Sequence, residues 1–88
     1  YYFNTKYCRH CILFAPEWKK IVESNSNIVC RSIDAADSKN EALVFYYNVT
    51  SVPTIIFVHN NQIFEYKGST RTADSINEFI RNHVADSV

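Results

Sequence analysis

In the first half of the chain, apolar residues occur both as short continuous runs and at helical spacing. Tyr1 to Phe3 form an aromatic run typical of the end of a strand, and Ile28 to Ile33 form an apolar run typical of a buried strand. Between these runs, apolar residues return at helical spacing from Cys11 to Ser24, and Pro16 is expected to kink that helix. We expect the helix to bury a broad face formed by Ile12, Leu13, Ala15, Trp18, Ile21 and Val22. A second helix is predicted from Ser38 to Tyr47.

The second half of the chain changes to β-branched and aromatic runs before a helical pattern returns. Thr54 to His59 and Gln62 to Tyr66 flank Asn60-Asn61, which predicts two strands joined by a tight hairpin. Thr72 to His83 predict a closing helix whose inward face consists of Ala73, Ile76, Phe79, Ile80 and Val84. Parallel pairing is expected among the first strands and an antiparallel hairpin later. The predicted fold class is therefore α/β, a three-layer α/β/α sandwich around a mixed central sheet.

Size and charge limit the functions that this chain can have. Its 88 residues, of which 47% are hydrophobic, predict a single small domain over residues 1–88. Nine basic and nine acidic residues cancel, so the charge gives no sign of a nucleic-acid partner. The longest apolar run, Val52 to Val58, is far shorter than the roughly 20 residues needed to span a bilayer, so no membrane insertion by this segment is expected. Because the chain does not begin with Met, we expect it to be a fragment of a longer chain.

Cys8 and Cys11 are the main candidates for chemistry. Their spacing, with two residues between them, allows the two thiols to close into a reversible disulfide. At the start of the first predicted helix, Cys8 would lie near unpaired backbone N–H groups and the positive end of the helix dipole, which favour a thiolate. Cys8 is therefore the predicted nucleophile.

The same cysteine spacing also occurs in zinc sites and in structural disulfides. Zinc requires four ligands, and the remaining candidates form no second pair with ligand spacing; they are Cys30, His10, His59 and His83. A structural disulfide across so short a loop would constrain the unfolded chain very little. We therefore favour a redox pair without a metal, and this chemistry requires no dissociable cofactor. Cys30 is interpreted as a small buried hydrophobic residue without a catalytic role.

Asn48 follows the second predicted helix and has two interpretations. Asn tolerates the left-handed backbone conformation of a helix terminus, which favours a structural role. Asn48-Val49-Thr50 is also an N-glycosylation sequon, which would be used only in a secretory compartment. We favour the structural interpretation.

The arrangement of these motifs resembles the thioredoxin-fold superfamily. A Cys-x-x-Cys opens a helix, a proline follows five residues after Cys11, and Ser-Val-Pro-Thr opens the third strand. The catalytic domains of protein disulfide isomerases are the most similar branch, through Tyr7, Cys8, Arg9, His10, Cys11, Leu13 and Pro16, with Arg9 in place of the usual glycine. The similarity continues through Ile33-Asp34-Ala35, Tyr47-Asn48-Val49, Val52-Pro53-Thr54, Tyr66-Lys67-Gly68 and Arg71. It covers almost the whole chain, although the family has a further strand and helix before the position of Tyr1.

The resemblance implies a thiol-disulfide oxidoreductase or isomerase that acts on cysteines of protein or peptide substrates. Cys8 would form a mixed disulfide, Cys11 would resolve it, and a redox partner protein or glutathione would recycle the pair. Pro53 would be a cis proline beside the disulfide. The resemblance places Tyr7, Val52 and Pro53 in substrate binding, with the Val52 backbone pairing with an extended substrate segment.

Three further residues are predicted to adjust the thiol pKa values. His10 lies between the cysteines, where a partly charged imidazole would favour the Cys8 thiolate, and Arg9 adds a fixed charge in the same loop. By resemblance, Arg71 would approach Cys11 and favour its deprotonation. The His-containing motif favours the endoplasmic reticulum lumen or another secretory compartment, by resemblance only, with the cytoplasm as the alternative.

Two positions depart from the isomerase pattern and leave other functions open. Tyr2 stands where catalytic isomerase domains carry a buried acid, and Ser32 where they usually carry a lysine, a pair that helps proton transfer at Cys11. One alternative is therefore a redox-impaired, chaperone-like module that holds client proteins in a groove at Pro53. Another is the thioredoxin domain of a larger sulfhydryl oxidase.

Overall fold

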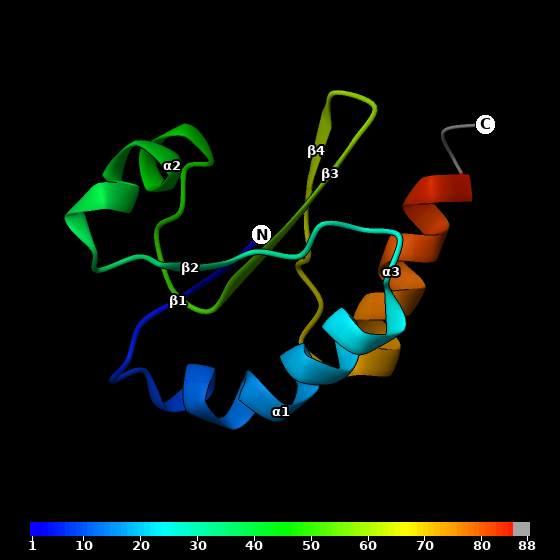
Figure 1. The fold of residues 1–88 in the computed structure, drawn as a ribbon, viewed down its shortest axis with the longest axis horizontal. Helices are drawn as coiled ribbons and strands as arrows, with labels where there is room; N and C mark the ends of the chain where they lie inside the picture. Colours follow the sequence, from blue (N-terminus) through cyan, green and yellow to red (C-terminus); the bar gives the residue numbers. More distant parts are fainter. Residues whose placement is uncertain (86–88) are drawn as a thin grey trace.

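A computed structural model describes residues 1–85, which fold around one four-stranded sheet (Figure 1). The elements in chain order are β1 (Tyr2–Asn4), α1 (Arg9–Ser24), β2 (Ser32–Asp34), the 3₁₀ turn η1 (Ser38–Asn40), α2 (Glu41–Tyr46), β3 (Thr54–His59), β4 (Gln62–Glu65) and α3 (Ala73–Ala85). The spatial order of the strands is β2-β1-β3-β4. β1 pairs with β2 in parallel, whereas β3 is antiparallel to both β1 and β4, so the predicted mixed sheet is confirmed.

Helices cover both faces of this sheet, and the alternation of side chains along β1 shows how (Figure 1). The ring of Tyr2 packs against Phe14 and Trp18 of α1, at centroid distances of 5.1 and 5.0 Å. The next residue, Phe3, points to the opposite face and contacts Tyr47 at the end of α2, with centroids 6.0 Å apart. The three-layer sandwich is therefore confirmed.

The main hydrophobic core lies between the sheet and the helices α1 and α3. Its buried members are Tyr2, Phe14, Ile21, Ile55, Ala73 and Ile76, and Trp18, Tyr66 and Ile80 pack against them. Tyr2 belongs to this core and lies six residues before Cys8. The packing of β1 and α1 therefore fixes where Cys8 and Cys11 lie relative to the sheet.

The inward face of α1 is narrower than the sequence predicted. The helix begins at Arg9 rather than near Cys11, and its buried residues are Cys11, Phe14 and Ile21. Ile12 and Leu13 are 61% and 65% exposed, so the prediction that they face the core is wrong, as it is for Ala15 and Val22. The helical period explains this result, because only residues three or four apart share the stripe that meets the sheet.

The second strand is shorter and begins later than predicted. Only Ser32–Asp34 form β2, and Val29 is 75% exposed. Residues 32 to 34 are the part of this segment that pairs with β1, in parallel. The strand is therefore limited by backbone pairing and not by the length of the apolar run.

The other boundaries differ less from the predictions. The second predicted helix is divided into η1 and α2, and Val84, expected to face inward in α3, is exposed. Asn48 has a φ of 54°, which supports its structural interpretation as the residue that ends a helix. Asn60 and Asn61 have φ values of 51° and 63°, so the tight hairpin between β3 and β4 is confirmed. Over residues 1–85, no helix is both long and apolar enough to cross a membrane.

Candidate active site

Cys8 lies at the N-terminus of α1, where the chain passes from the loop after β1 into the helix. Its backbone is extended, with φ −79° and ψ 115°, and it occupies the N-cap position. Its sulfur accepts a hydrogen bond from the backbone N–H of Cys11 at 3.2 Å. A cysteine thus takes the place of the usual Ser, Thr, Asp or Asn cap, and its Sγ faces the unpaired N–H groups of the first helical turn.

These contacts favour the ionised form of Cys8. The hydrogen bond with the Cys11 side chain lowers the pKa of the Cys8 thiol most. The backbone N–H groups of Cys11 and His10 and the positive charge of Arg71 lower this pKa further, although partial burial opposes them. Cys8 is half-buried, so its sulfur remains accessible to a substrate. An ionised Cys8 can therefore attack a substrate disulfide, and an oxidised Cys8 can be attacked by a substrate thiolate.

Cys11 has the opposite character. It is one helical turn further along, on the inward face of α1, and only 4% exposed. Burial raises the pKa of the Cys11 thiol, and the hydrogen bond with Cys8 raises it further. The two thiols are not bridged in this structure, so an outer thiol with a lowered pKa lies beside an inner thiol with a raised pKa.

The segment before β3 brings a second part of the chain to Cys8. The Cys8 thiol approaches the carbonyl oxygen of Val52 at 3.8 Å, and the Val52–Pro53 peptide bond is cis. Beside them lies a polar cleft of about 270 Å³, whose lining includes Pro53, Thr54, Tyr66, Lys67, Gly68 and Arg71. Residues 44 positions apart in sequence therefore meet at the sulfur.

The remaining predicted site residues lie around this centre on the surface. Tyr7 is 94% exposed immediately before Cys8, and Arg9 and His10 are exposed in the first turn of α1. His10 contributes its backbone N–H to the Cys8 sulfur. The charge of Arg71 acts on Cys8, so the structure links this side chain to the first thiol.

Tyr2, at the position where isomerase domains carry a buried acid, reaches Cys11 from β1 and makes a hydrogen bond there that the sequence analysis did not predict. Its hydroxyl donates a hydrogen bond to the backbone carbonyl of Cys11 at 3.2 Å, and its proximity to the Cys11 side chain lowers the pKa of that thiol. Burial, followed by the nearby Cys11, raises the pKa of Tyr2 far above its usual range. The available signal was the alternation along β1, which directs Tyr2 to the same face of the sheet as α1.

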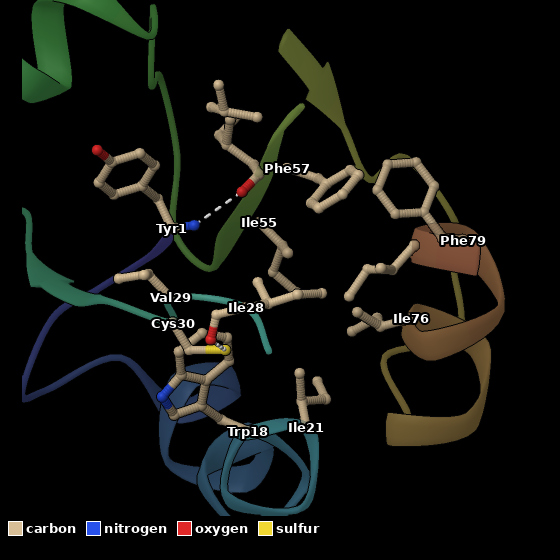
Figure 2. Close-up of a pocket in the computed structure, with 13 residues that line it drawn as sticks. Tyr1, Trp18, Ile21, Ile28, Val29, Cys30, Ile55, Phe57, Ile76 and Phe79 are labelled. Carbon is tan, nitrogen blue, oxygen red and sulfur yellow. Dashed lines mark hydrogen bonds between the residues drawn. The ribbon is translucent and has the colours of Figure 1, made fainter. Parts of the chain in front are cut away.

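Cys30 lies away from this pair. It lines an apolar cavity of about 90 Å³ between β3, α1 and α3, and Figure 2 shows its sulfur near Trp18, with Ile21 and Ile76 across the cavity. Burial raises the pKa of the Cys30 thiol, which disfavours a reactive thiolate. Among residues 1–85, no three His, Cys, Asp or Glu side chains gather in a way that could hold a metal ion.

Comparison with known proteins places this geometry in context. Residues 1–82 match the thioredoxin family. The chain is 36% identical to a protein disulfide-isomerase from barley (Hordeum vulgare), an alignment that covers 93% of this chain and 17% of that protein. The first thioredoxin domain of mouse protein disulfide-isomerase A4 has 30% identity and a TM-score of 0.75, covering 92% of this chain and 59% of that one. A malarial protein has 26% identity and a TM-score of 0.78, covering 93% and 91% of the two chains.

Proposed function

This chain belongs to the thioredoxin family, and from that premise we propose that it is a thiol-disulfide oxidoreductase domain acting on cysteines of proteins. The observation that carries the proposal is the unequal pair of thiols at the start of α1. The outer thiol has a lowered pKa and the inner thiol a raised one. A low-pKa nucleophile followed by a buried resolving thiol is what two-step disulfide exchange requires.

The proposed reaction begins at Cys8. Its thiolate attacks one sulfur of a substrate disulfide, forms a Cys8–substrate disulfide, and releases the other substrate sulfur as a thiolate. Cys11 then loses its proton and attacks the Cys8 sulfur. The Cys8–Cys11 bond forms, the substrate leaves as a second thiolate, and the substrate has gained two electrons. The reverse sequence oxidises a dithiol, and a cycle that ends with Cys8 and Cys11 as they began isomerises a disulfide.

Substrate binding is proposed at the meeting point of Cys8 and the Val52–Pro53 segment. The Val52 carbonyl lies 3.8 Å from the Cys8 sulfur, so a substrate cysteine joined to Cys8 would bring its own backbone beside Val52. Backbone pairing of this kind gives affinity with little side-chain selectivity. The exposed ring of Tyr7, the residue before Cys8, would add apolar contact with the substrate.

The cellular setting is proposed from the relatives. The chain spans 17% of the length of the barley protein disulfide-isomerase, so its partners and substrates within a whole protein are part of this proposal. Similarity to disulfide isomerases supports a secretory compartment, where a redox partner protein or glutathione would recycle the cysteine pair. The exchange chemistry needs no dissociable cofactor, because the Cys8–Cys11 disulfide itself carries the electrons.

One structural observation keeps the client-binding alternative in view. Over the described residues, no acidic or basic side chain is buried, so no buried carboxylate is available to take the proton of Cys11. A module with slow resolution could still hold extended clients at Pro53. The Cys8→Ser, Cys11→Ser double variant separates the two functions: client binding that is unchanged while exchange is lost would support the binding module.

The test of the proposal is the trapping of its intermediate. With a peptide that contains one disulfide, Cys11→Ser should accumulate a peptide joined to Cys8, whereas Cys8→Ser should accumulate none, as read by intact mass spectrometry. Cys30→Ser is the matched control and should exchange like the unsubstituted chain. Exchange by Cys8→Ser at the unsubstituted rate would overturn the assignment.

A further inference from the structure

Tyr2 places a hydroxyl group inside the core of the domain next to the resolving thiol. It is 4% exposed, and the buried residues of the described chain include no charged side chain and no amide. The buried side chains of this site therefore carry two polar groups, the Cys11 thiol and the Tyr2 hydroxyl. A polar group in such a place needs a hydrogen-bond partner, and its partner here is Cys11.

The packing of Tyr2 fixes where its hydroxyl points. Its ring meets Phe14 edge-on, with an interplanar angle of 67°, and contacts Trp18 on the next turn of α1. The hydroxyl oxygen lies 3.2 Å from the carbonyl oxygen of Cys11 and is close enough to the Cys11 side chain to lower the pKa of its thiol. A hydroxyl carries one proton and can turn it between two acceptors, so the same group can serve the carbonyl in one state and the sulfur in another.

The resolving thiol also has a route to solvent on this side. A cleft of about 270 Å³ opens beside α1, and Tyr2 and Cys11 form part of its lining together with Lys6, Ala15 and Ser32. Its volume is enough to hold several water molecules. Cys11 is only 4% exposed, so this cleft gives its proton an opening to water.

Tyr2 is suited to donate a hydrogen bond and not to remove a proton. Burial raises the pKa of Tyr2, so its hydroxyl stays protonated when the neighbouring thiol ionises. The groups that act on Cys11 are Cys8 on the same helix, the Tyr2 hydroxyl from β1 and the backbone of Thr5 in the intervening loop. Tyr2 and Thr5 lower the pKa of Cys11, against the larger effect of burial.

We infer that the Tyr2 hydroxyl assists the resolving step by donating a hydrogen bond to the Cys11 thiolate, while the cleft beside it passes the thiol's proton to water. The inference rests on the proposed function. In this step the Cys11 S–H bond breaks and the proton goes to water or to a buffer base in the cleft. The electron pair left on Cys11 forms the bond to the Cys8 sulfur. The Cys8–substrate bond breaks, and its electron pair leaves on the substrate sulfur as a thiolate.

The test measures the two steps separately in a Cys30→Ser background. Tyr2→Phe removes one hydroxyl and keeps the ring contacts, and Tyr47→Phe removes a hydroxyl on the opposite face of the sheet as the matched control. A hydrogen bond to a charged group is strong enough that Tyr2→Phe should resolve a preformed mixed disulfide about tenfold more slowly at neutral pH. Its rate–pH profile should move up by about one unit, and attack by Cys8 should keep its rate. Tyr47→Phe should match the unsubstituted chain.

A second measurement does not depend on how Tyr2→Phe folds. In a chain with Cys8→Ser and Cys30→Ser and with ¹³C at the tyrosine ring carbon that bears the hydroxyl, the Tyr2 resonance should shift as Cys11 titrates. The Tyr47 resonance should not follow that titration. The inference would be overturned by a Tyr2 resonance that does not shift as Cys11 ionises. It would also be overturned if Tyr2→Phe resolved the mixed disulfide with an unchanged pH profile. Failure of the unsubstituted chain to exchange disulfides at all would instead overturn the proposed function.

Discussion

At the scale of single residues, the two cysteines of the motif differ because the helix places them differently. Cys8 caps the helix and faces its free N–H groups, whereas Cys11 lies one turn later on the buried face. The sequence predicts the first role, because a Cys-x-x-Cys before an apolar helical pattern places its first residue at the cap. The resemblance places position 2 near Cys11, but the hydrogen bond from the Tyr2 hydroxyl to the Cys11 carbonyl depends on how β1 and α1 pack.

The difference between the thiols should be visible in their alkylation by iodoacetamide at neutral pH. Cys8 should react first, because its pKa is lowered, whereas burial raises the pKa values of Cys11 and Cys30. Peptide mapping of briefly treated, fully reduced protein identifies the modified residue. Preferential labelling of Cys11 or Cys30 would contradict the assignment of Cys8 as nucleophile.

Arg71 should contribute to this reactivity through its charge. The positive charge of Arg71 lowers the pKa of Cys8, so Arg71→Gln should raise that pKa. Iodoacetamide should then alkylate Cys8 of this variant a few-fold more slowly at neutral pH and equally fast in alkaline buffer. Arg81→Gln, at an exposed position of α3, is the matched control and should have no effect. High salt should reduce the difference, because it screens exposed charges. A rate unaffected by Arg71→Gln at low salt would remove Arg71 from the site.

At the scale of elements, α1 and α3 are joined by polar side chains as well as by the core. Glu17 of α1 accepts a hydrogen bond from the backbone N–H of Ala73 at 3.0 Å, which satisfies a free donor at the start of α3. Near the other end of α1, Asn25 donates to the Asn77 side chain at 2.8 Å. These contacts fix the angle between two helices that the sequence predicts only one at a time.

The carboxylate of Glu17 should stabilise the fold in a pH-dependent manner. The Ala73 N–H, and then Lys20, lower the pKa of Glu17 in the folded state. The stabilisation is therefore complete above the unfolded pKa and is lost as the pH falls through the lower, folded value. Glu17→Gln should lower the melting temperature by a few degrees at neutral pH, and the difference should disappear in strong acid. Glu23→Gln, exposed on the same helix, is the control, and a pH-independent difference for Glu17→Gln would contradict the argument.

The hairpin between β3 and β4 depends on two asparagines with left-handed backbone. Asn61 has a φ of 63°, a conformation that costs about 1–2 kcal/mol for a residue with an ordinary side chain. Asn61→Ala should therefore lower the free energy of unfolding by about 1 kcal/mol, whereas Asn61→Gly should leave it nearly unchanged. Urea unfolding of the three proteins tests this, and equal stability of the Ala and Gly variants would contradict the turn geometry.

At the scale of the whole molecule, the fold class follows from the order of the predicted elements. Apolar runs and helical patterns in a strand-helix-strand order predict a parallel pair with a helix packed on it, and Asn60-Asn61 predicts a hairpin. The bounds of strands and the facing of side chains were less predictable, because they depend on how the elements pair and pack in the folded chain. Ile28 to Cys30 resemble a strand but lie outside the register that pairs with β1, and Ile12 and Leu13 are apolar but face outward.

The small core makes the domain sensitive to cavities. Ile76 is 1% exposed between the sheet and α1, so Ile76→Ala should lower the free energy of unfolding by about 2–5 kcal/mol. The whole free energy of unfolding of a protein domain is only about 5–15 kcal/mol, so this variant should unfold at a clearly lower urea concentration. Ile76→Val is the matched control, with an expected loss of about 1 kcal/mol. Similar losses for both variants would contradict the tight packing of this residue.

The most direct test of a redox function is the equilibrium between the Cys8–Cys11 dithiol and disulfide in glutathione buffers of known ratio. Mass spectrometry after acid quenching and alkylation identifies which thiols titrate. We predict a single reversible two-electron transition in Cys8 and Cys11, with Cys30 unchanged and a midpoint near about −180 mV, as for lumenal isomerases. A chain in which Cys8 and Cys11 form no reversible disulfide at any glutathione ratio would contradict the proposed function.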